Sequence, residues 1–138
     1  MTNIDIIKRK ISEVEKYLKM VFKYKNISSK KVSDDEILRG AIERHLYLLC
    51  QSTIDLGEVI IAYLKLRTPS TYAEIFEILE ENSIIDKNLA LKMKKMTGFR
   101  NILAHAYGEI NLDIVLAVLQ KDISDFLLFL QEAKTKIP

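Results

Sequence analysis

The chain has 138 residues, of which 49% are apolar and 29% are charged, and its formal net charge is +2. This length fits a single domain over residues 1–138, and the composition excludes a disordered or fibrous chain. Only four glycines and two prolines are present, which disfavours a β-sandwich with many turns and favours helices.

The predicted elements are all helices, because apolar residues recur at steps of three and four almost throughout. A second helix is predicted to begin at Ser33, which forms a capping box with Glu36. Val32 and Ile37 are placed as a hydrophobic staple across the same start. The first helix ends before the KNISSKK segment at residues 25–31, and its apolar stripe is Ile4, Ile7, Ile11, Val14, Leu18, Val21 and Phe22.

The second helix continues without proline to about Leu66. About 30 residues at ~1.5 Å each would extend ~45 Å, so this helix either bends or presents part of its length to a partner. Arg44, Gln51 and Asp55 recur on it at steps of seven and four and form a polar face. That face either hydrogen-bonds across the bundle or brings Arg44 to a cleft. His45 is expected to be partly buried or at an interface, and not a second catalytic base.

Three further helices have clear start signals. Thr71 and Glu74 form a second capping box, and Asp86 and Asn111 are placed as N-caps of the fourth and fifth helices. The acidic segment 74–81 is expected to face solvent. Five helices joined by short loops predict an all-α, up-and-down helical bundle. The inner stripes of these three helices contain Tyr72, Ile75, Phe76, Leu79, Leu89, Met93, Met96, Leu112, Val115, Leu116, Leu119, Ile123, Phe126, Leu127 and Leu130.

Two apolar runs overflow a single helix stripe. The second helix carries Leu46, Leu48, Leu49 and Cys50, and the fifth carries four apolar residues at 127–130. Burying both sides of a helix in a small bundle often requires a second copy of the chain. We therefore expect a homodimer.

Membrane, metal and cofactor signals are weak. No apolar run approaches the ~18–20 residues that cross a bilayer, and the N-terminal segment is charged too early for a secretion signal. We expect a cytoplasmic protein that makes no membrane contact. Cys50 is expected to be a small buried hydrophobe. One cysteine and two histidines far apart in the sequence make no metal-ligand pattern, so we predict no metal site. The sequence contains no phosphate-loop motif, so we predict no nucleotide cofactor.

The segment FRNILAHAYGEI, residues 99–110, contains one of the two histidines. On a helical wheel at ~100° per residue, Arg100 and His105 lie ~140° apart and converge poorly within one regular helix. Either the helix breaks near Gly108 and turns His105 inward, or another chain completes a site. The same wheel places Phe99, Ile102, Leu103 and Ala106 on the core side.

The polar side of this segment carries Arg100, Asn101, His105 and Tyr107. A histidine with a pKa of ~6.5 can take or give a proton near neutral pH. An arginine can hold a phosphate through two hydrogen bonds and stabilise the charge that develops on it. Together they could promote attack of a ribose 2′-OH on the adjacent phosphate without a metal. Spacing alone equally allows a polar helix face with local hydrogen bonds.

The pattern R-N-x-x-x-H-x-Y at these four residues resembles the signature of the HEPN superfamily. Its R-x4-H-x-Y form is typical of HepT-like toxins, the HEPN halves of HEPN–MNT toxin–antitoxin pairs. An all-helical chain of this length, with the motif shortly before a long final helix, agrees with that family. The resemblance implies a HEPN-like homodimer in which both motifs face a shared cleft, and a metal-independent endoribonuclease of a type VII-like toxin–antitoxin pair.

By motif match, the resemblance makes His105 the acid/base residue and Arg100 the residue that binds phosphate and stabilises charge. Asn101 would help to orient them. The implied antitoxin is a minimal nucleotidyltransferase (MNT), which would silence the toxin by transferring AMP to Tyr107 and so adding charge and bulk near Arg100.

Two further expectations concern partners. Lys92, Lys94 and Lys95 precede the motif and could attract RNA by their field, without base specificity. A competing hypothesis is a non-catalytic helical module that binds a nucleotidyltransferase and serves as its substrate or regulator.

Overall fold

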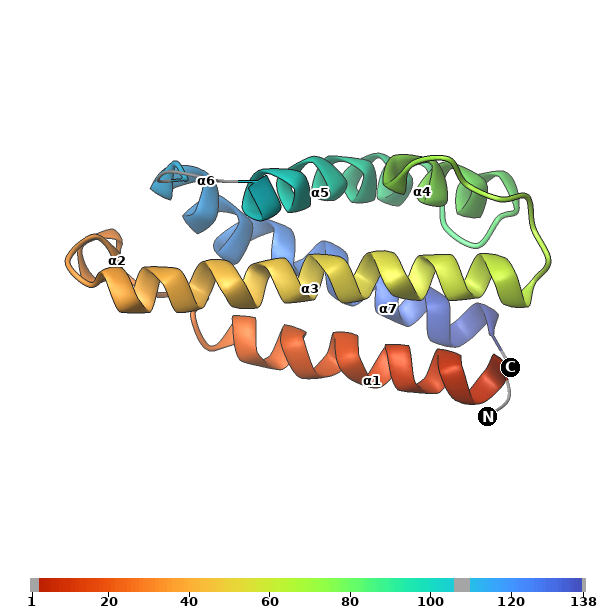
Figure 1. The fold of residues 1–138 in the computed structure, drawn as a ribbon, viewed down its shortest axis with the longest axis horizontal. Coiled ribbons are helices and arrows are strands. Elements are labelled where there is room, and N and C mark those ends of the chain that lie inside the picture. Colours follow the sequence, from red (N-terminus) through yellow and green to blue (C-terminus); the bar gives the residue numbers. More distant parts are fainter. Residues whose placement is uncertain (1–2, 106–109, 138) are drawn as a thin grey trace.

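The computed structural model describes residues 3–105 and 110–137, and every element within them is a helix (Figure 1). This confirms the predicted all-α class. The helices α6, η1 and α7 follow one another without a break, and η1 is π-helical. The elements are α1 (Asn3–Phe22), α2 (Ser29–Ser33), α3 (Glu36–Tyr63), α4 (Tyr72–Glu81), α5 (Lys87–His105), α6 (Leu112–Ala117), η1 (Val118–Asp122) and α7 (Ile123–Lys136).

The bundle is organised around α3, which runs along the long axis of the molecule in Figure 1. Helix α3 packs against α1, α4 and α5, while α7 packs against α1 and α5. The helices run up and down along one another, as predicted. Residues 3–105 and 110–137 contain five long helical stretches if α6, η1 and α7 are taken together. The short α2 is an additional helix, which occupies part of the segment that was expected to link the first two.

Helix α3 supplies much of the core. Its fully buried apolar side chains are Ile42, Leu46, Leu49, Cys50, Ile54, Leu56 and Ile60. Each large aliphatic side chain of this kind contributes about 1.5–3 kcal/mol to folding through its removal from water. Cys50 is buried as predicted, and burial raises the pKa of its thiol well above the usual range, while the charge of Arg100 partly lowers it.

Helix α3 is also the one described helix that is long and apolar enough to cross a membrane by length and composition. Of its most apolar window, 56% is buried inside the bundle. A central core helix has this character because it is covered by neighbours on several sides.

The predicted start of the second long helix was wrong by two residues. The N-cap of α3 is Asp35, whose Oδ1 accepts a hydrogen bond from the Leu38 amide at 3.0 Å. Ser33 instead ends α2, because the chain forms this extra helical turn before α3 begins. The predicted staple is also wrong: Val32 is buried, but Ile37 is 87% exposed.

The other three caps are confirmed. The Thr71 hydroxyl accepts from the Glu74 amide at 3.1 Å, and the Asp86 carboxylate accepts from the Leu89 amide at 2.8 Å. The Asn111 side chain accepts from the Asp113 amide at 2.8 Å. Each cap satisfies an amide that the first helical turn would otherwise leave without a partner.

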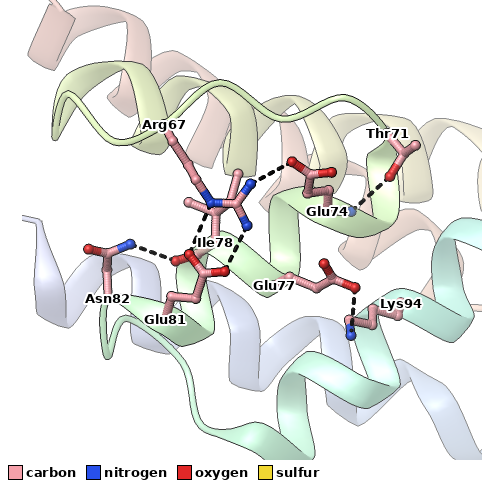
Figure 2. A network of polar contacts seen from close by, with 8 residues as sticks. All are labelled: Arg67, Thr71, Glu74, Glu77, Ile78, Glu81, Asn82 and Lys94. Carbon is pink, nitrogen blue, oxygen red and sulfur yellow. Dashed lines mark hydrogen bonds and ion pairs between the residues drawn. The ribbon is translucent and has the colours of Figure 1, made fainter.

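The acidic side of α4 is bound by the chain's own cations (Figure 2). Arg67, in the loop after α3, donates to Glu74 at 2.6 Å and to both oxygens of Glu81 at 2.7 and 3.1 Å. The hydrogen bond from Arg67 lowers the pKa of Glu81. Lys94 of α5 pairs with Glu77 at 3.0 Å. These exposed pairs contribute little energy each, but they fix where the loop and α5 lie against α4.

Helices α3 and α4 approach closely at Gly57. A Cβ added there would lie 2.7 Å from Cγ2 of Ile75, a side chain that is itself fully buried. A β-branched side chain in a packed core has little room to move. The absence of a side chain at Gly57 is therefore what allows this packing distance.

We expect Gly57→Ala to lower the free energy of unfolding by about 1 kcal/mol or more, because the added methyl group overpacks the α3–α4 contact. The matched control is Gly40→Ala, also in α3, where an added Cβ meets nothing within 4 Å. That change should raise stability by about 0.5–1 kcal/mol through helix propensity. Urea unfolding followed by circular dichroism measures both, and equal effects would contradict the close-contact explanation.

Candidate active site

The predicted site residues lie at the end of α5. The helix continues through Arg100 and Asn101 to His105, its last residue. Arg100 is half-buried against the bundle, while Asn101 and His105 are exposed. Tyr107 lies outside the described residues. The apolar side predicted for this segment is partly wrong, because Ile102 is 49% exposed, although Phe99 is buried and Leu103 is half-buried.

Hydrogen bonds hold the Arg100 side chain against α3. Its Nε donates to Oε1 of Gln51 at 2.8 Å, and the Gln51 amide in turn donates to Asp55 at 2.8 Å. The terminal nitrogens make longer contacts, to Asn101 at 3.2 Å and to the Tyr47 hydroxyl at 3.4 Å. The short bond therefore fixes the guanidinium through Nε, and the outer nitrogens are held more weakly.

Two aromatic rings enclose the same guanidinium. Its central carbon lies 5.4 Å from the centroid of Tyr47 and 5.0 Å from the centroid of Tyr72. Tyr47 belongs to α3, and Tyr72 is the first residue of α4. Such cation–π contacts orient an arginine without neutralising its charge. Three helices thus cooperate to place one positive group at the surface.

The polar face predicted on α3 is therefore real, and it hydrogen-bonds across the bundle. Gln51 and Asp55 form the chain of contacts that ends on Arg100. Arg44 takes no part in this series of hydrogen bonds. It is exposed, and its guanidinium lies 5.4 Å from the centroid of Tyr47.

The structure does not bring His105 to Arg100. Within the described part of the chain, no hydrogen bond or ring contact joins the two side chains. Because α5 is regular through His105, the wheel offset of ~140° applies to this pair. Asn101 does lie beside Arg100, as the motif suggests. Within the described residues of one chain, Arg100 and Asn101 therefore lie together, but His105 does not join them.

A contact from the start of α3 fixes the chain just after the motif. Arg39 donates through Nη2 to the backbone carbonyl of Ile110, and its Nε donates to Glu43 at 3.0 Å. Ile110 is buried and directly precedes the cap of α6. Arg39 therefore ties the exit of the motif segment to α3. Spacing within the sequence gives no signal for a contact over such a separation.

The second histidine has a structural place. His45 is half-buried, its Nδ1 lies 3.3 Å from the Tyr24 hydroxyl, and the two rings stack at 5.9 Å. This agrees with the expectation of a partly buried histidine. Among the described residues, no group of three or more His, Cys, Asp or Glu side chains is placed to hold a metal ion.

The lysines expected to attract RNA are mostly paired with acids. Lys92 lies 3.4 Å from Asp125, and Lys94 lies 3.0 Å from Glu77. Lys92 and Lys95 line a hollow of about 310 Å³ between α5 and the η1–α7 stretch, beside Asp122. Burial, with the nearby charge of Asp125, raises the pKa of Asp122. This mixed surface is less positive than the sequence alone indicated.

Known proteins agree with the fold and with the family resemblance. A family model described as "Ribonuclease HepT-like" matches residues 7–133. The chain belongs to this HepT-like family. It is 32% identical to the mRNA nuclease HepT of Shewanella oneidensis over 132 residues, which cover 96% of this chain and 98% of that protein. It is 28% identical to the tRNA nuclease HepT of Aphanizomenon flos-aquae over 134 residues, covering 96% and 91%.

The fold of this HepT-like chain is also that of a solved toxin. The structure of a tri-AMPylated HEPN toxin from Shewanella oneidensis in complex with MNT antitoxin superimposes with a TM-score of 0.86. The two sequences are 31% identical, and the match covers 99% of this chain and all of the other. The predicted HEPN-like bundle is thereby confirmed.

Breaking the Gln51 contact tests how Arg100 is positioned. In Gln51→Ala, the Arg100 Nε loses its short hydrogen bond. Because an exchanging proton must first leave that bond, the Nε proton of the variant should exchange with water roughly tenfold faster than that of the wild type. Arginine side-chain NMR measures this rate. Gln131→Ala, an exposed position on α7, is the control and should leave it unchanged. An unchanged rate in Gln51→Ala would refute the positioning role.

Proposed function

We propose that this chain is a metal-independent endoribonuclease toxin whose site is formed by Arg100, Asn101 and His105. One observation carries the proposal. Within the described residues, the Arg100 guanidinium is fixed by neutral partners and forms no ion pair with a carboxylate. An arginine held in this way keeps its full charge for an anionic ligand, and a backbone phosphate of RNA is such a ligand.

The chemistry follows from the properties of these groups. His105 takes the proton of a ribose 2′-OH, and the 2′-oxygen attacks the adjacent phosphorus. The bond from phosphorus to the 5′-oxygen breaks, and that oxygen leaves with the proton that His105 returns, so the products are a cyclic phosphate and a free 5′-hydroxyl. Arg100 stabilises the charge that builds on the phosphate oxygens during this step. Asn101, beside Arg100, orients the guanidinium.

A homodimer is part of this proposal. Ile102 and Leu91 are exposed by 49% and 53%, and on the wheel they fall on the same face of α5 as His105. Large apolar side chains on one exposed face favour a partner surface. A second protomer that covers this face would place its own residues beside His105 and could complete the site.

The proposed antitoxin is an MNT-type nucleotidyltransferase, like the partner of the solved Shewanella toxin. It would act on Tyr107, whose phenol oxygen attacks the α-phosphate of ATP and releases pyrophosphate. The AMP group would carry negative charge close to Arg100 and compete with RNA for it. We also propose a cytoplasmic location, where such a toxin would meet both its RNA substrate and this antitoxin.

The second hypothesis is a non-catalytic module that binds and regulates a nucleotidyltransferase. It is favoured by the exposure of His105 and by its separation from Arg100. It predicts complex formation and AMP transfer without RNA cleavage. The two hypotheses therefore differ in the activity of the isolated chain.

RNA cleavage in the presence of EDTA tests the first hypothesis. His105→Ala should lower the rate by about 100-fold or more, since general acid–base catalysis contributes that much. His45→Gln is the matched control, because it changes the other histidine, and it should retain activity if circular dichroism shows an intact fold. Full activity in His105→Ala would remove this residue from the mechanism.

Mass spectrometry tests the role of Tyr107. After incubation with the partner nucleotidyltransferase and ATP, the protein should gain the mass of AMP, and RNA cleavage should fall with the modified fraction, because the added negative charge opposes RNA at the site. Tyr107→Phe should gain no mass, whereas Tyr17→Phe on α1 should be modified like the wild type. An adduct that persists in Tyr107→Phe would place the modification elsewhere.

A further inference from the structure

Two arginines share one aromatic ring at the α3–α5 contact. The guanidinium carbons of Arg44 and Arg100 each lie 5.4 Å from the centroid of Tyr47. The two carbons are therefore within about 11 Å of each other. Arg44 is exposed on α3, whereas Arg100 is half-buried on α5. Arginines from two helices thus contact the same Tyr47 ring, and this brings two positive charges close together.

These two charges are not neutralised within the described part of the chain. Arg39 and Arg67 each form an ion pair with a glutamate, but Arg44 and Arg100 form none. The acid on the polar face of α3, Asp55, accepts a hydrogen bond from the Gln51 amide instead. Like charges that are held close without acids favour an anion between them or beside them.

The Tyr47 ring makes this arrangement possible. Its negative π face attracts each guanidinium and offsets part of their mutual repulsion. Its hydroxyl also accepts a long hydrogen bond from Arg100 at 3.4 Å. Each outer nitrogen of Arg100 keeps a second N–H besides its long contact to Asn101 or to Tyr47. Within the described residues, no hydrogen bond engages the outer nitrogens of Arg44. These nitrogens have the geometry that binds phosphate oxygens in pairs.

We propose that Arg44, Tyr47 and Arg100 of one protomer form a phosphate-binding platform. Arg100 takes the phosphate at which cleavage occurs, and Arg44 takes a neighbouring phosphate of the same strand. The two guanidinium carbons are at most about 11 Å apart, so both can contact the same strand. The assignment of RNA as the ligand rests on the proposed function, whereas the binding of phosphate does not. Arg44 is on this account a substrate-binding residue that adds affinity without base specificity.

Inorganic phosphate is the first probe. Arginine Nε signals of the full chain are followed by NMR during a phosphate titration at constant ionic strength. The signals of Arg44 and Arg100 should shift and saturate together, while Arg9, an exposed arginine of α1, should not shift. Tyr47→Leu should abolish the saturable shift of Arg44 while circular dichroism shows an intact fold. No saturable shift at Arg44, or a shift at Arg100 alone, overturns the platform.

RNA is the second probe. Arg44→Ala should raise KM for a single-stranded RNA about tenfold and leave kcat nearly unchanged, because the lost contact serves binding before the chemical step. The salt dependence of RNA binding should weaken by about 0.7 in log–log slope, as for one lost phosphate contact on a single strand. Arg9→Ala removes the same charge on α1 and should change neither value. An equal effect in Arg9→Ala would show that Arg44 acts only through its long-range charge, and would overturn its proposed contact with the strand.

The two probes separate this inference from the proposed function. If phosphate saturates Arg44 and Arg100 but the wild type cleaves no RNA, the platform stands and the ribonuclease proposal fails. If the wild type cleaves RNA but Arg44→Ala keeps its KM and its salt slope, the ribonuclease proposal stands and the platform fails.

Discussion

The contact between Arg100 and helix α3 constrains the whole candidate site. A half-buried guanidinium requires hydrogen-bond partners, and Gln51 and Tyr47 supply them from α3, while the ring of Tyr72 covers it from α4. Meeting these partners fixes the rotation of α5 about its axis. Because α5 is regular to its last residue, the same rotation turns His105 outward to the surface.

The fold and the proposed chemistry are linked through this rotation. The arginine that would hold phosphate is built into the bundle, and the histidine that would move the proton stands on the exposed face with Ile102. Our preferred explanation is that His105 of a second protomer acts beside Arg100. A rigid arginine and an exposed histidine from different chains then form a site only on assembly, and AMP on Tyr107 would act close to the fixed charge.

Local features could be predicted from the sequence, and long-range ones could not. The caps at Thr71, Asp86 and Asn111 depend on residues two or three positions apart, so spacing suffices. The cap at Ser33 failed because an extra turn, α2, forms before α3. The motif of Arg100 and His105 was identified, but Gln51, which fixes Arg100, lies 49 residues away, and only the folded bundle brings them together. Nothing in the spacing marks Tyr47 as the shared support of two arginines.

Mixing two inactive variants tests most directly whether the site needs two chains. Arg100→Ala and His105→Ala are unfolded together, refolded as a mixture, and assayed for RNA cleavage. If Arg100 and His105 act from different protomers, half of the dimers are mixed and one of their two sites is intact, so about a quarter of wild-type activity should return. If both residues act within one chain, every site lacks one of them, and a mixture as inactive as its components would contradict the account.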